Sequence, residues 1–156
     1  MTAARTTTDP AEFDVFFKSG FGEYLASEAG GEVGKWGGPF ALTDVGIVDG
    51  ALPGTPENAL ALGSYSISDD PTNSDSVIGL QVTARAKGQD PRGTERLTAK
   101  VYDQLHGLTN VLLPGGVYVV QCYRQSWTSL GQDENSRWRE VSNFYVTVHR
   151  PSKYRS

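Results

Sequence analysis

The sequence predicts an α+β fold in which two helices pack on one face of a mostly antiparallel four-stranded sheet. Two Asp-Pro pairs each begin a helical pattern, and four further segments have the composition of strands. These elements follow in the order helix, strand, strand, helix, strand, strand. An extended, glycine-rich arm is expected to be added to this framework.

The first helix is predicted to begin at the Asp-Pro pair 9–10 and to end at the glycine pair 30–31. Aspartate caps helix N-termini, and proline suits the first helical position. Gly20 and Gly22 each weaken a helix by about 1 kcal/mol relative to alanine. Tertiary packing, and not helix propensity, is therefore expected to stabilise this helix. Large apolar side chains recur at three- and four-residue spacing and form one face: Phe13, Phe16, Phe17, Phe21, Tyr24 and Leu25.

The second helix is predicted from the Asp-Pro pair 90–91 to Gly107. Residues 30–56, which contain many glycines and turn residues, are expected to form the extended arm or a small hairpin. The predicted strands are 59–67, 76–86, 116–126 and 138–149. One core is expected to unite Leu97, Val101, Leu105, Val82 and Phe144.

The length of 156 residues fits one domain over 1–156, with a flexible N-terminus at 1–8 and a basic C-terminal tail at 150–156. The first residues lack the apolar region of a secretion signal, and no apolar run reaches the 18 residues of a membrane span. We therefore expect a protein that is made in the cytoplasm and does not contact a membrane.

Charge is distributed unevenly along the chain, whose net charge is −4. Residues 1–75 contain 12 acidic and 3 basic residues, a net charge of −9, whereas residues 76–156 contain 6 acidic and 11 basic residues, a net charge of +5. The imbalance can be neutralised within one fold or between copies of the chain, and charges scattered over a solvated surface are a third interpretation.

No catalytic residue, cofactor or metal site is predicted. The single cysteine, Cys122, lies in an apolar run and is interpreted as a core thiol. The histidines, His106 and His149, belong to separate elements, so a triad with this thiol has no local support. Tryptophans beside arginines resemble a single-strand nucleic-acid platform, but the negative net charge argues against sequence-specific nucleic-acid binding and favours a protein interface.

In its motifs and their order, the chain resembles the tail terminator proteins, often labelled minor capsid proteins, of long-tailed bacteriophages, particularly those of actinobacterial hosts. The most telling pieces are the glycine-to-arginine loop 131–137 and the pair Asn143-Phe144. The segments and residues that carry the resemblance are 43–48, 52–53, Pro56, Tyr65, 69–71, 77–82, Arg85, 90–91, 105–108, 130–131, Asp133, Arg137 and 142–145.

The resemblance implies a non-enzymatic virion subunit that forms a ring, usually a hexamer, on the last ring of the tail tube at its head-proximal end. Its expected partners are further copies, the tail tube protein and the head-tail connector protein. The ring would stop tube polymerisation and join the tail to the connector. A head-completion or connector protein of the same virion is the alternative, and a small enzyme or ligand-binding domain is a third hypothesis without a supporting motif.

A ring of identical subunits requires two different complementary surfaces on each subunit. The candidate residues for these assembly surfaces are Asp69, Asp70, Asp133, Arg137, Trp138 and Arg139. Among them, Arg137 and Arg139 are the expected basic contributors, and the aspartates are expected at loop tips that meet the tube or the connector. The competing interpretation is that the tips are merely solvated and that assembly uses apolar contacts.

Overall fold

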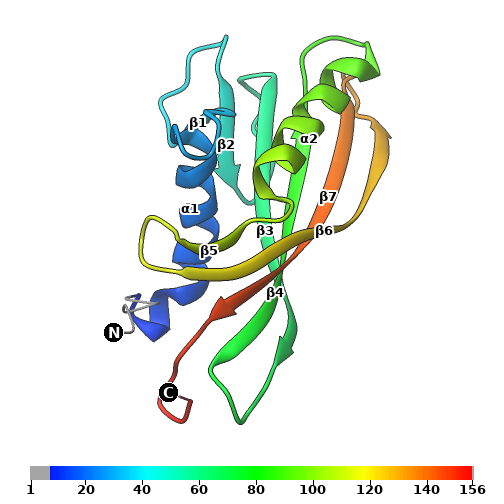
Figure 1. The fold of residues 1–156 in the computed structure, drawn as a ribbon. Helices are drawn as coiled ribbons and strands as arrows, with labels where there is room; N and C mark the ends of the chain where they lie inside the picture. The colour runs from blue at the N-terminus through cyan, green and yellow to red at the C-terminus, as the bar shows by residue number, and fades with distance from the viewer. Residues whose placement is uncertain (1–7, 156) are drawn as a thin grey trace.

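A computed structural model describes residues 8–155, which form a strongly twisted, curled seven-stranded sheet with two helices (Figure 1). The strands lie in the order β1-β2-β3-β4-β7-β6-β5. β1, β2 and β3 are mutually parallel, whereas every other neighbouring pair is antiparallel. The elements are η1 (Pro10–Glu12), α1 (Phe13–Ala26), β1 (Lys35–Trp36), β2 (Val45–Asp49), β3 (Asn58–Asp69), β4 (Asp75–Arg85), α2 (Pro91–Leu105), β5 (Thr109–Leu112), β6 (Tyr118–Gln132) and β7 (Trp138–His149).

The prediction of a four-stranded, mostly antiparallel sheet is wrong. The four expected strands exist as β3, β4, β6 and β7, but β1, β2 and β5 extend the sheet to a mixed half-barrel. The predicted arm or hairpin at 30–56 instead supplies β1 and β2, which pair in parallel with one another and with β3. The predicted flexible N-terminus, apart from Thr8, lies outside the described residues.

A short return loop, residues 50–57, makes the unexpected parallel pairing possible. Parallel neighbours usually need a crossover of a dozen or more residues. Here β2 is only five residues long, and an extended chain covers about 3.3 Å per residue, so this loop reaches back to the start of β3. Gly50 N donates to Leu62 O at 3.0 Å. The buried Arg85 donates to Pro56 O and Glu57 O, both at 2.8 Å, which fixes the end of the loop.

One apolar cluster joins both helices to the sheet. α1 packs against β1, β2 and β3, whereas α2 packs against β4, β6 and β7. The predicted shared core is confirmed, because the cluster contains all five expected residues: Leu97, Val101, Leu105, Val82 and Phe144. The helix α1 adds its buried aromatic face to the same cluster through Phe13, Phe17 and Phe21.

Gly22, in the middle of α1, is required for packing although glycine is a weak helix former. A Cβ atom at Gly22 would overlap the indole of Trp36 on β1. Because Gly22 has no side chain, β1, the shortest strand of the sheet, can lie directly against α1. Packing offsets the weakness of glycine as a helix former, as the sequence predicted.

The β3–β4 hairpin projects beyond the helices at one end of the molecule (Figure 1). The first half of β3 is buried, whereas residues 65–69 are exposed. The chain after β7 crosses beside this hairpin, where Arg155 donates to Asp70 O at 2.9 Å and to Ser76 Oγ at 2.8 Å. Arg150 forms two hydrogen bonds, of 2.8 and 3.0 Å, with the carboxylate of Asp14 at the start of α1.

Candidate functional site

Cys122 and His106, whose residue types occur in catalytic sites, make contacts here that support the fold. Cys122 is wholly buried, and burial raises the pKa of its thiol to about 12, so the thiol is protonated at neutral pH. The backbone of Gly107, next to His106, bonds to Cys122 O. The ring of His106 nevertheless stacks on Tyr102 with 4.7 Å between centroids, and its Nδ1 accepts from Arg124 N at 3.0 Å. Within residues 8–155, no group of three or more potential metal ligands occurs.

The six candidate assembly residues lie in two groups at opposite ends of the sheet. β4 and β7 pair from Asp75 opposite His149 to Arg85 opposite Arg139. This length of antiparallel strand spans roughly 30 Å at about 3.4 Å per residue. Asp69 and Asp70 lie by the first end, and Asp133, Arg137, Trp138 and Arg139 lie by the second.

At the hairpin end, the two acids remain accessible although they have partners within the chain. The Asp69 side chain is 58% exposed, accepts from Ser76 Oγ at 2.6 Å and lies 4.0 Å from Arg155. The pKa of Asp70 is lowered, chiefly by a side-chain hydrogen bond from Thr72 and then by its backbone N–H. Together with Asp14–Arg150, these contacts neutralise part of the charge imbalance within the fold.

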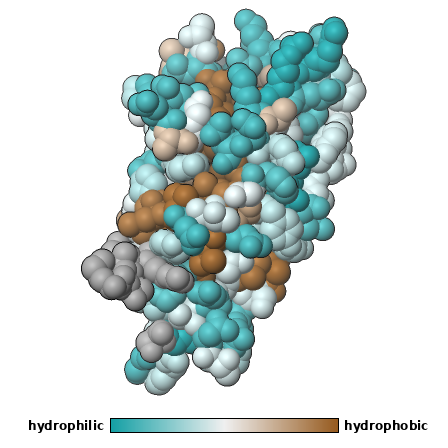
Figure 2. Space-filling view, viewed as in Figure 1, coloured by the Kyte–Doolittle hydropathy of each residue, from teal (hydrophilic) through white to brown (hydrophobic). Residues whose placement is uncertain are grey.

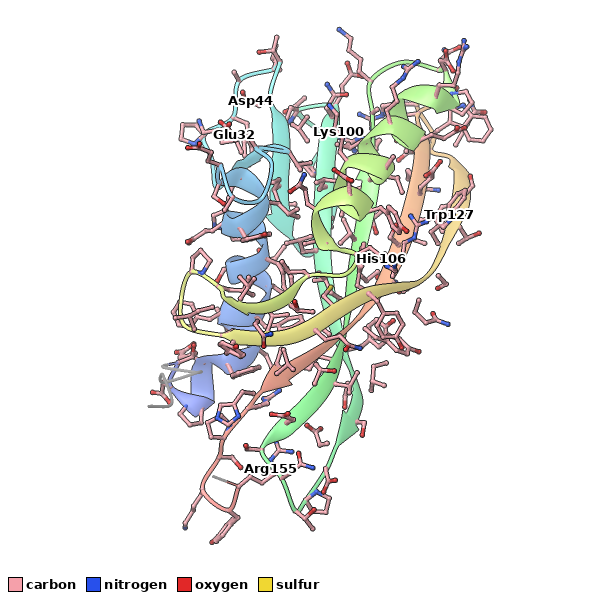
Figure 3. All side chains as sticks on the ribbon, in the orientation of Figure 1. Glu32, Asp44, Lys100, His106, Trp127 and Arg155 are labelled. Carbon is pink, nitrogen blue, oxygen red and sulfur yellow. The ribbon has the colours of Figure 1, made fainter. Side chains whose placement is uncertain are left out.

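A cavity of about 680 Å³ opens between this hairpin and the chain after β7. Figure 3 shows Arg155 at this end of the molecule. The cavity has charged walls of both signs, lined among others by Asp14, Asp69, Asp70, Arg150 and Arg155. It is therefore a polar, mixed-charge hollow and not an apolar ligand pocket of the usual kind.

At the opposite end, the β6–β7 turn holds its charged residues inward. Arg137 Nε lies 3.0 Å from Asp133 Oδ2, with side-chain exposures of 11% and 14%, and Arg137 also donates to Gly54 O at 3.3 Å. Trp138 Nε1 donates to Gln89 O at 2.9 Å. Arg139 Nε is buried without a hydrogen-bond partner in the described part of the chain. Arg139 Nη2 donates to Leu130 O on the neighbouring strand at 3.5 Å. Arg137 and Trp138 consequently attach the turn to neighbouring loops, and Arg139 attaches it to β6.

Asp133→Asn is expected to reduce stability at neutral pH. The pKa of Asp133 is lowered, first by the backbone N–H of Arg137 and then by that of Asn135. A lowered folded-state pKa stabilises the fold above the unfolded-state value, about 3.9, and this contribution is lost as pH falls through the folded value. Urea unfolding of both proteins should therefore show a gap that is constant from pH 7 to 5 and shrinks below about pH 4. A gap that persists at the lowest pH would contradict this role for the charge.

Sequence reasoning assigned the tryptophans beside arginines to a protein interface, but it missed the contact through Tyr102 that links α2 to β6. The guanidinium of Arg124 lies 4.2 Å from the ring centroid of Tyr102 and 5.8 Å from that of Trp127. Trp127 is 51% exposed and lies on the outer part of β6 (Figure 3). Trp, Tyr and Arg are the residue types that dominate binding hot spots. The only signal in the sequence was the proximity of Arg124 and Trp127 within one strand.

A row of tyrosines crosses the sheet face opposite the helices. Tyr65 on β3 covers Gly79, where a Cβ atom would overlap its ring. Its hydroxyl donates to Asn143 Oδ1 at 3.1 Å. Tyr145 and Tyr123 continue the row with an edge contact of 5.8 Å between centroids. On the helix side, by contrast, apolar surface gathers around the middle of the molecule, near β5, where Leu112 is exposed (Figure 2).

A comparison of the sequence with protein families decides between the functional interpretations. Residues 24–150 match the family described as bacteriophage tail terminator protein. The chain belongs to this family. The match covers α2 and all the strands from β1 to β7, whereas η1 and most of α1 precede it. This tail terminator is thus a structural component of a phage virion.

Comparison of the structure gives a related result. The tail terminator chain is similar to a chain in a solved structure entitled "Virion of native gene transfer agent (GTA) particle", with 19% sequence identity and a TM-score of 0.53. The similarity covers 65% of this chain and 77% of the other, and it concerns the fold. No curated protein matches the sequence. Neither helix of the described residues is long and apolar enough to cross a membrane.

Proposed function

We propose that this tail terminator forms a closed ring, usually of six copies, at the head-proximal end of the phage tail. The ring stops polymerisation of the tail tube and presents the surface to which the head-tail connector binds. The match to the tail terminator family over residues 24–150 carries this proposal. The role is one of binding and geometry, and it involves no catalytic residue and no cofactor.

The two ends of the sheet supply chemically different surfaces for such a subunit. The β3–β4 end presents the accessible carboxylates Asp69 and Asp70, whereas the β6–β7 end presents a turn whose shape depends on Arg137, Trp138 and Arg139. A ring that lies between a tube and a connector has two different axial neighbours. We assign the tip of the β3–β4 hairpin, at Asp70, to one of these neighbours and the β6–β7 turn to the other, with Asp133 acting through the conformation of the turn. Asp69, the last residue of β3, then remains available for contacts between copies.

The proposal predicts a specific defect in a phage that lacks this gene. Tube assembly should continue without a stop, so electron microscopy should show tails of abnormal and variable length that are not attached to heads. Filled heads should accumulate beside them. Expression of the wild-type protein from a plasmid should restore tails of normal length. Tails of normal length that stay joined to heads in the deletion phage would contradict the proposed role.

A further inference from the structure

Two strand segments have a neighbour on one side only. β2 covers β3 from Asn58 to Leu62, so among the described residues no strand lies beside residues 63–69 on that edge. β5 covers β6 only up to Gln121, after which loop residues bond to Cys122 and His106 bonds to Arg124 N. Beyond that point, residues 125–132 of β6 pair with β7 alone in the described structure.

Neither open segment contains a lysine or a proline. These residues are two of the devices by which natural proteins discourage an edge strand from pairing with another chain. Residues 63–69 read Gly-Ser-Tyr-Ser-Ile-Ser-Asp and residues 125–132 read Gln-Ser-Trp-Thr-Ser-Leu-Gly-Gln, so both lack these residues. Each segment contains or borders an irregularity in register with its paired strand, which adds twist and bends the strand. Two copies paired through these edges would consequently be rotated relative to each other, as a closed ring requires.

We propose that residues 63–69 of one copy pair with residues 125–132 of the next copy to form an antiparallel ladder. This inference rests on the proposed ring and names its subunit interface. The sheet order β3-β4-β7-β6 consists of antiparallel neighbours, so β3 and β6 run in opposite directions at its two margins. A further copy added at one margin continues the alternation. Each copy offers one segment of each kind, which is the heterologous contact that rotation closes into a ring.

Charge and apolar surface support the same pairing. In an antiparallel ladder, the Asp69 end of β3 lies beside the Arg124 end of the neighbour's open segment. The Asp69 side chain is 58% exposed, and the arginine is held in place over Tyr102. Both segments also expose apolar side chains that a neighbouring copy would cover: Tyr65 at 39%, Ile67 at 37%, Trp127 at 51% and Leu130 at 45%.

Cysteine cross-linking tests this interface directly. If Asp69 lies opposite Gln125, Ser68 lies opposite Ser126, and both side chains lie on the sheet face opposite the helices, because Ser68 pairs with Val77 and Ser126 with Asn143. Opposed Cβ atoms in such a ladder are about 4.5–5.5 Å apart, close enough for a disulfide after small movements. Copies with Ser68→Cys mixed with copies with Ser126→Cys should form disulfide-linked dimers on mild oxidation. The irregularity between Ser66 and Ser68 shifts the register by one residue, so a mixture of Ser64→Cys with Ser129→Cys tests a second position, on the helix face. The native Cys122 is wholly buried and serves in every sample as the background.

A matched mixture replaces Ser126→Cys with Thr109→Cys, at an exposed threonine on β5. This control should give no dimer, and a chain with both Ser68→Cys and Ser126→Cys should give a ladder of products that ends at the closed ring. Light scattering, with and without the tube protein, measures ring formation separately. Rings without either edge cross-link would overturn the interface and leave the ring proposal standing. A chain that stays monomeric beside its tube protein would overturn both.

A charge exchange provides a second readout. Asp69→Arg and Arg124→Asp should each weaken ring formation about tenfold or more, and a chain with both changes should recover most of it. Asp103→Arg, an exposed reversal on α2, is the control and should assemble normally. If both single reversals assemble like this control, the proposed contact between Asp69 and Arg124 is wrong.

Discussion

Phe21→Ala is expected to lower the free energy of unfolding by about 3–5 kcal/mol. Phe21 is wholly buried on α1, and its ring meets Phe17 edge to face with 5.2 Å between centroids. Alanine would leave a cavity between α1 and the parallel part of the sheet, because the surrounding side chains relax only partly. Urea denaturation measured by circular dichroism gives the change directly.

Phe16→Ala is the matched control for this substitution. Phe16 belongs to the same helix but is 38% exposed, so its removal takes less apolar area out of the core. A clearly smaller loss of stability is expected for this variant. Equal losses for the two phenylalanines would contradict the placement of α1 on the sheet.

Leu105→Ala is expected to cost about 2–5 kcal/mol for the corresponding reason at the second helix. Leu105 is wholly buried in the last turn of α2 and belongs to the same apolar cluster as Val82 and Phe144. Leu112→Ala removes the same atoms from a side chain that is 49% exposed and serves as the control. A thermal midpoint that is unchanged in Leu105→Ala would show that α2 does not pack as described.

The periodic elements of the fold could be predicted because their signals are local. The second Asp-Pro pair places the N-cap of α2, where Asp90 accepts from Arg92 N. The first pair begins the short 3-10 helix η1, in which Asp9 accepts from Ala11 N, and α1 follows directly from Phe13. The four long strands could also be predicted, because the alternation of apolar and polar residues extends over many positions. β1 and β5 are two and four residues long, which is too short for a period to appear. Their existence depends on pairing with distant partners, which outweighs local propensity.

The candidate site shows the same division between local and distant information. Composition predicted a polar loop over Asp69 and Asp70, and the structure places Asp69 at the end of β3 and Asp70 in the turn that follows, both exposed. Composition could not reveal that Arg137 bonds to Gly54, because that contact joins residues 83 positions apart in the sequence. The assembly role of these residues therefore stays a prediction, and their contribution to the turn is the part that the structure adds.

The position of β7 affects how the polypeptide acquires its fold during synthesis. β7 is the last strand to leave the ribosome, yet it lies between β4 and β6. Its pairing joins Asp75 to His149, 74 residues apart. Such distant contacts form slowly, because the entropy of loop closure must be lost first. Until β7 has been synthesised and has left the ribosome, β4 and β6 each have an unsatisfied edge, which is open to pairing with another chain.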